Sequence, residues 1–181
     1  MQNKASIRVA FCGLSAALML VVMLLGTMVP FSTFLCPGIA GALAIPVLWE
    51  FGLRPGMLLY IAVSILSLIL APDKEAAFLF VFLLGWYPIL RPKLQHIRNK
   101  PLRGAVKWVV FAAAICAVYA LLLFVFTMPE LTAEAATWTL PILTAMLLLG
   151  SVTFLCYDIL LGRLQLLYVA RLRPKLFSRK P

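Results

Sequence analysis

Charge is scarce in this chain, and acidic charge especially so. Only 12% of the 181 residues are charged, and six acidic side chains stand against sixteen basic ones. Hydrophobic residues make up 64% of the chain, whereas a soluble domain is about half apolar and a quarter charged. The composition therefore excludes an ordinary water-soluble domain. It predicts an all-α, polytopic integral membrane protein, with residues 1–181 forming a single domain.

Side chains that carry chemistry are also few. The chain has one histidine, His96, and its four cysteines form no CxxC pair (Cys12, Cys36, Cys116 and Cys156). Zinc sites need such residues at close spacing, so no metal site is expected. No Gly-rich phosphate loop, HExxH or GxSxG motif is present. We therefore expect no cofactor and no enzymatic activity.

Six apolar segments are present instead, near the length of about 20 residues that a helix needs to cross a bilayer. The predicted helices cover approximately residues 9–28, 38–51, 56–71, 75–90, 106–126 and 140–168. Residues 29–38 contain Pro37 and Gly38 and predict a loop. Pro72 is expected to stop the third helix, and Asp73 to cap the N-terminus of the fourth.

Residues 56–90 allow two interpretations, either two short tilted spans or a re-entrant hairpin that turns inside the protein. Three charges lie at the turn, in residues 73–75. A non-helical turn exposed to lipid at mid-depth would leave its backbone polar groups unsatisfied. We therefore favour two spans.

The basic residues alternate along the chain with pairs of apolar segments. Fifteen of the sixteen lie at the N-terminus, at Arg54, in residues 91–107 or in residues 163–180, and the exception is Lys74. Under the positive-inside rule this pattern predicts that both termini lie in the cytoplasm. The net charge of +10 is then a topology signal and a contact to anionic lipid heads, with no nucleic acid as partner.

Two acidic residues fall near predicted inner helix ends. Glu50 precedes Arg54, and Asp158 precedes Arg163. Each acid could be a proton or ion site, but an acid at a membrane boundary is ordinarily solvated or paired. We expect interfacial pairs of Glu50 with Arg54 and of Asp158 with Arg163.

Polar residues near the predicted outer side are candidates for binding a solute. Ser64 and Ser67 share one face of the third helix with Tyr60, and this face either packs against other helices or lines a pocket. The turn formed by Asp73, Lys74 and Glu75 is either a simple capped turn or the rim of a solute site.

Three strings carry a family resemblance: residues 8–18 (RVAFCGLSAAL), 50–56 (EFGLRPG) and 85–88 (GWYP). With six helices in about 180 residues, the middle ones short and both ends inside, the chain resembles the substrate-binding S components of energy-coupling factor (ECF) transporters. The resemblance implies a protein of the bacterial cytoplasmic membrane that captures a vitamin-like or metal solute on the outer side. It implies delivery by toppling within a complex of a transmembrane scaffold subunit and two ATPases.

The resemblance also implies roles for particular residues. The solute site would lie in the outer half, with residues 29–38 as a lid, and its candidates are Ser64, Ser67, Asp73, Lys74, Glu75 and Trp138. The small-residue row of the first helix, Ala10, Gly13 and Ala17, would dock on the scaffold, although the same row could serve internal packing. The family's Ala-xxx-Ala pattern is replaced here by Gly13-xxx-Ala17.

Two other functions remain open. The first is a membrane interaction or scaffold protein, similar to the rod-shape protein of the cell-wall elongation machinery. The second is a small proton-coupled carrier that uses Glu50 and Asp158.

Overall fold

The computed structural model describes residues 2–26, 32–95, 99–124 and 140–172, and these residues are helical apart from short turns. Within these ranges there is no strand. Six helices are long and apolar enough to cross a membrane: Ser6–Leu25, Thr33–Phe51, Leu53–Leu70, Lys74–Gln95, Pro101–Leu121 and Thr144–Arg171. The all-α class and the six candidate spans are thus confirmed. The third and fourth are 18 and 22 residues long, as the two-span interpretation requires.

The helical elements, in chain order, are α1 (Gln2–Leu25), α2 (Ser32–Ala42), α3 (Ile45–Phe51), α4 (Leu53–Leu70), α5 (Lys74–Leu79), η2 (Phe80–Leu84), α6 (Tyr87–Gln95), α7 (Lys100–Phe124), α9 (Leu140–Leu167) and η3 (Tyr168–Leu172). The second span consists of α2 and α3, and the fourth of α5, η2 and α6. The elements η2 and η3 are π-helical.

The predicted loop over residues 29–38 is wrong from residue 32 onward, because α2 begins at Ser32 and contains Pro37. Proline removes one backbone hydrogen bond from a helix interior. A loop exposed to lipid would leave many more polar groups unsatisfied. Pro37 is fully buried, and at Gly38 an added Cβ would lie 3.5 Å from the Tyr157 ring. Tertiary packing thus maintains the helix through both helix-breaking residues.

The connection between the second and third spans is shorter than predicted. Gly52 alone separates α3 from α4, with φ 85° and ψ −172°, a backbone region that is essentially restricted to glycine. Helix α4 begins at Leu53, so Arg54 and Pro55 lie in its first turn. Proline is tolerated there because the first N–H groups of a helix have no intrahelical acceptor.

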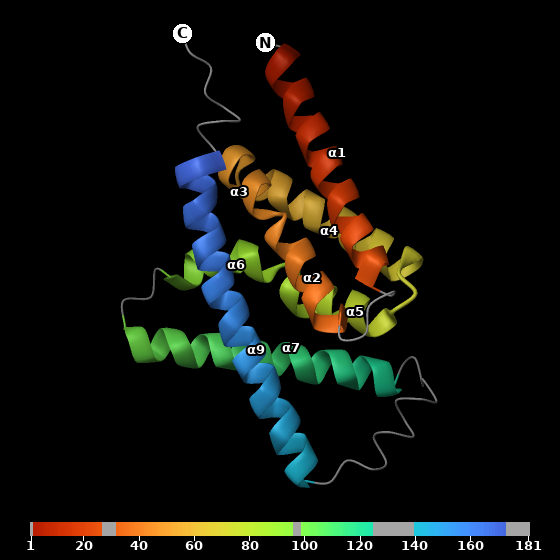
Figure 1. Ribbon diagram of the computed structural model, residues 1–181, viewed down its shortest axis with the longest axis vertical. Coiled ribbons are helices and arrows are strands. Elements are labelled where there is room, and N and C mark those ends of the chain that lie inside the picture. The colour runs from red at the N-terminus through yellow and green to blue at the C-terminus, as the bar shows by residue number, and fades with distance from the viewer. Residues whose placement is uncertain (1, 27–31, 96–98, 125–139, 173–181) are drawn as a thin grey trace.

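The fourth span lies at the centre of the molecule. Of its most apolar stretch, 67% is buried, against 11% to 39% for the corresponding stretches of the other five spans. Its residues belong to two packed clusters. One cluster joins it to α1, α2, α3 and α4, and the other joins it to α7 and α9. In Figure 1, α9 crosses in front of α7, and α1 lies on the side of α2 that is away from α9.

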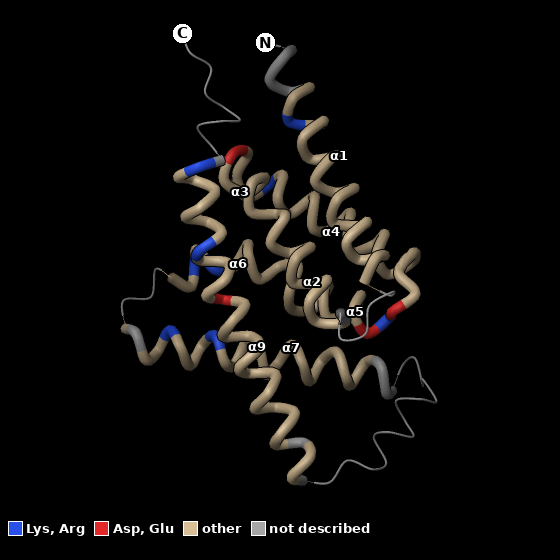
Figure 2. The backbone as a smooth tube through the Cα atoms, viewed as in Figure 1, with Lys and Arg blue, Asp and Glu red and all other residues tan. Residues whose placement is uncertain are grey.

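The outer faces of the helices are apolar. Leu58, Ile69, Leu149 and Leu166 are each about 70% exposed, which suits a hydrocarbon solvent rather than water. Figure 2 shows that the described Lys and Arg residues lie toward the top and left of the view, away from the α4–α5 turn, except for Lys74. The charges are therefore segregated in space as well as in sequence.

Candidate functional site

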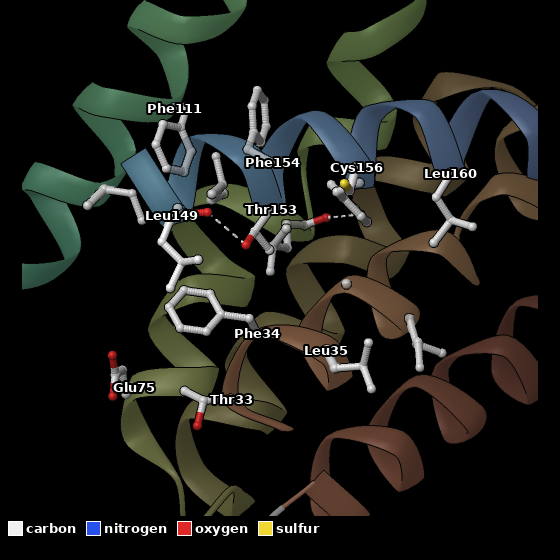
Figure 3. Close-up of a pocket in the computed structure, with 17 residues that line it drawn as sticks. Thr33, Phe34, Leu35, Glu75, Phe111, Leu149, Thr153, Phe154, Cys156 and Leu160 are labelled. Atoms are coloured by element: carbon white, nitrogen blue, oxygen red, sulfur yellow. Dashed lines mark hydrogen bonds between the residues drawn. The ribbon is translucent and has the colours of Figure 1, made fainter. Parts of the chain in front are cut away.

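A cavity of about 800 Å³ lies between α2, the α5–η2 segment, α7 and α9 (Figure 3). Most of its lining is apolar, including Phe34 and Leu35 from α2, Phe111 from α7 and Phe154 from α9. The size falls within the range of about 300–1,000 Å³ that is usual for small-molecule sites. The cavity therefore has the dimensions and the surface of a site for one apolar solute.

Glu75 is the charged residue of the cavity lining. It is half-buried and lies in the first turn of α5, where the helix dipole stabilises a negative charge. Its Oε1 accepts a hydrogen bond from the Tyr119 hydroxyl at 2.8 Å. In Figure 3, Glu75 and Thr33 lie together at one end of the cavity. The carboxylate is thus held at the cavity by a neighbour from α7.

Asp73 positions this turn, as the sequence predicts. Its Oδ1 accepts a hydrogen bond from the Ala76 N–H at 3.0 Å, which caps α5. Its Oδ2 accepts from the Thr33 hydroxyl at 3.2 Å, which joins the turn to α2. Lys74 extends in another direction, since its Nζ donates to the carbonyls of Leu68 and Ala71 at the end of α4. Asp73 and Lys74 therefore hold the ends of the two helices, and Glu75 lines the cavity.

The predicted serine pair lies elsewhere. Ser64 and Ser67 are buried in α4 and do not line the cavity. Ser67 Oγ donates to the Ser64 carbonyl at 3.0 Å, and the Tyr60 hydroxyl donates to the Val81 carbonyl of η2 at 2.6 Å. This face of α4 thus packs against the fourth span. Trp138 lies outside the described residues, as do positions 29–31 of the predicted lid.

The hydroxyl groups around the cavity have already donated their hydrogens. Thr153 donates to the Leu149 carbonyl at 2.9 Å, and Tyr157 donates to the Leu84 carbonyl at 2.9 Å. Thr33 donates to Asp73, as described above. Each of these hydroxyl oxygens keeps lone pairs, and the Glu75 carboxylate is an acceptor only. The lining therefore presents hydrogen-bond acceptors to a solute.

The π-helix η2 forms one wall of the cavity through Leu83 and Leu84. The Gly85 N–H bonds to the Phe80 carbonyl at 2.7 Å, five residues back. A Cβ added to Gly41 of α2 would lie 2.2 Å from the Leu84 carbonyl oxygen, so this close approach requires glycine. Single π-turns inside α-helices are frequent at functional sites.

A second polar cluster lies away from Glu75 and joins α6, α7 and α9. Asp158 Oδ1 accepts from Arg91 Nε at 2.9 Å and from the Tyr87 hydroxyl at 2.7 Å, and its Oδ2 accepts from Lys107 Nζ at 2.5 Å. The predicted pairing with Arg163 is wrong. At 3.6 residues per turn, residues five apart on one helix point about 140° apart. Cations thus contact both oxygens of Asp158, and the carboxylate joins α6, α7 and α9.

Arg91 is the most buried charge of this cluster, at 6% exposure. Its Nη1 donates to the Gln165 side chain at 2.6 Å. Gly162 leaves room for the guanidinium, since an added Cβ would lie 2.6 Å from Nη2. The other acid near this region, Glu50, accepts from the Tyr168 hydroxyl at 3.3 Å. Its predicted pairing with Arg54 is wrong: the ion pairs among the described residues do not include it, and the break at Gly52 separates the helices that carry the two residues.

The small-residue row of α1 faces outward. Ala10, Gly13 and Ala17 are exposed, and a Cβ added at Gly13 would meet nothing within 4 Å. Helix α1 packs inward through a different face, which includes the buried Met19 and Met23. Among the described residues, internal packing therefore does not use the row.

Comparison of the chain with family models, with curated proteins and with solved structures yields no match. The function is therefore inferred from the geometry of the cavity and from the resemblance stated above.

Proposed function

We propose that the protein is a membrane-embedded solute-binding subunit of an importer, of the S-component type, in the cytoplasmic membrane of a bacterium. The observation that carries the proposal is the cavity of about 800 Å³ among four candidate spans, with Glu75 as its charged lining residue. Apart from Lys74, the described basic residues lie away from the Glu75 end. With both termini in the cytoplasm, the positive-inside rule then puts the Glu75 end of the cavity on the outer side.

The lining suggests the chemistry of the solute. Its apolar walls suit a ring or a short hydrocarbon, and its acceptors suit N–H groups or a positive charge. Glu75 would form the charge-assisted contact, because a carboxylate in partly apolar surroundings binds a donor more strongly than a neutral oxygen does. We therefore propose a small, mainly apolar solute with at least one nitrogen donor.

The test is capture of small molecules by the purified protein from an extract of the culture medium. Bound molecules are released by denaturation and identified by mass spectrometry. The test variant is Thr153→Phe, which places a ring in the cavity. Its control is Thr144→Phe, which changes the same residue type on the same helix at an exposed position outside the cavity lining.

We expect the wild type and Thr144→Phe to retain the same small molecule, and Thr153→Phe to lose it. Equal retention by all three proteins, or no retained molecule in the wild type, would contradict the proposal. The apparent stability of each variant is measured beside capture, so that a misfolded Thr153→Phe is recognised.

The open face of α1 favours a second candidate, the interaction protein similar to the rod-shape protein. The outward row at Gly13 suits a partner helix in either case. The two functions separate by phenotype. For an importer subunit, both Gly13→Leu and Thr153→Phe should lower solute uptake. For a scaffold of cell-wall elongation, Gly13→Leu should alter cell shape, and Thr153→Phe should have no effect.

A further inference from the structure

A second groove, of about 500 Å³, lies on the opposite side of the fourth span, between α4 and the η2–α6 segment. Apolar and aromatic side chains line it, among them Met57 and Tyr60 from α4 and Phe82 and Trp86 from the fourth span. Lys93 is the charged residue of the lining. Met57 and Lys93 are exposed, so the groove opens at the surface.

The other polar groups of the groove are already engaged. The Tyr60 hydroxyl donates to the Val81 carbonyl, and the Trp86 indole N–H donates to the Phe82 carbonyl. Both ion pairs of the described part of the chain involve Asp158. Lys93 therefore has no carboxylate partner among the residues that the structure describes. The groove offers an apolar surface and one positive charge that no described carboxylate neutralises.

The groove follows the second half of the fourth span. Its lining begins at Val81 and Phe82 in η2, continues past the turn at residues 85–86, and ends at Lys93 in α6. In the span Lys74–Gln95, Phe82 lies near the middle of the sequence and Lys93 near the end. The apolar lining therefore lies toward the middle of the span, and the positive charge lies toward its end.

We propose that this groove binds one anionic phospholipid. Its acyl chain would lie along Met57, Phe82 and Trp86, and its phosphate would bind Lys93. A second cation, Arg54, lies in α4 one turn before Met57, which lines the groove. A basic group at the end of an intramembrane groove is the arrangement that recognises anionic headgroups. The proposal is independent of the solute function.

The test is native mass spectrometry of the purified full-length chain in detergent, titrated with dioleoylphosphatidylglycerol or with dioleoylphosphatidylcholine. We expect the wild type to bind one phosphatidylglycerol more tightly than phosphatidylcholine. Lys93→Gln should weaken the first phosphatidylglycerol about fivefold, since a basic residue near an anionic lipid contributes about 1 kcal/mol. The matched control is Arg163→Gln, an exposed cation outside the groove, which should leave this affinity unchanged.

Two further measurements test the occupant. Met57→Trp fills the groove and should remove the tight site. Inorganic phosphate at millimolar concentration should not displace the lipid, because the acyl chain supplies most of the contact. Equal affinity for the two lipids, equal effects of Lys93→Gln and Arg163→Gln, or displacement by phosphate alone would each overturn the proposal.

Discussion

Replacing Asp158 by alanine should strongly destabilise the folded protein. It leaves two cations without their counter-ion, and their side chains are only 7% (Arg91) and 13% (Lys107) exposed. Removing one partner of a buried ion pair costs about 3–5 kcal/mol. The Tyr87 hydroxyl also loses its acceptor, which adds about 1 kcal/mol. We therefore expect Asp158→Ala to lower the free energy of unfolding by an amount toward the upper end of that range.

The assay is equilibrium unfolding of the purified protein in mixed micelles with sodium dodecyl sulfate, followed by far-ultraviolet circular dichroism. The double variant Asp158→Ala/Arg91→Met separates charge from packing, because it removes the most buried stranded cation. We expect it to recover at least about 2 kcal/mol of the loss, since an apolar residue in place of a buried ion is often neutral. The control is Arg163→Met, an exposed cation on α9, which should stay within about 0.5 kcal/mol of the wild type.

A loss below about 1 kcal/mol for Asp158→Ala would refute this reasoning, because that value is typical of an exposed pair. A double variant as unstable as Asp158→Ala would also refute it. Either result would mean that the cluster is solvated in the folded protein.

Three other predictions concern single residues. Gly162→Ala should lower the free energy of unfolding by about 1–3 kcal/mol, because the added methyl group overpacks against Arg91, and the thermal unfolding temperature should fall. Its control is Gly104→Ala, where an added Cβ meets nothing within 4 Å. This control should raise the unfolding temperature, because alanine favours a helix more than glycine does. Gly52→Ala should lower the free energy of unfolding by about 1–3 kcal/mol, because alanine is strained at a φ of 85°. Unfolding in dodecyl sulfate measures this loss. Glu75→Gln should weaken the captured solute about tenfold or more in equilibrium dialysis, because a hydrogen bond to a charged group contributes about 1.5–3 kcal/mol.

The six helices were predictable because lipid imposes a simple rule. Each span needs about 20 apolar residues, and charges fall between the spans. The cap at Asp73 was predictable as well, because it depends only on residues three apart. The error over residues 29–38 has the same origin: proline and glycine signal a loop in water, but in lipid an interrupted helix satisfies more backbone groups than a loop does.

Contacts between helices were not predictable in the same way. Asp158 pairs with Arg91 and Lys107, which are 67 and 51 residues away in the chain, and no local spacing indicates such partners. The hydroxyl acceptors of the cavity were also missed, since Thr33 lies on α2 whereas Thr153 and Tyr157 lie on α9. A soluble helix shows its inward face by its apolar stripe. A helix that is apolar on all sides gives no such signal, so its inward face is known only from the fold.

Photo-crosslinking in the native membrane tests the proposed role as solute-binding subunit of an importer. A benzophenone amino acid replaces Gly13 on the open row of α1, and a control protein carries it at Ile69, which is 73% exposed on α4. Crosslinked partners are identified by mass spectrometry after purification. We expect position 13, and not position 69, to crosslink to a transmembrane subunit that co-purifies with two ATPases. Crosslinks to cell-wall elongation proteins, or the same products from both positions, would contradict the proposed role.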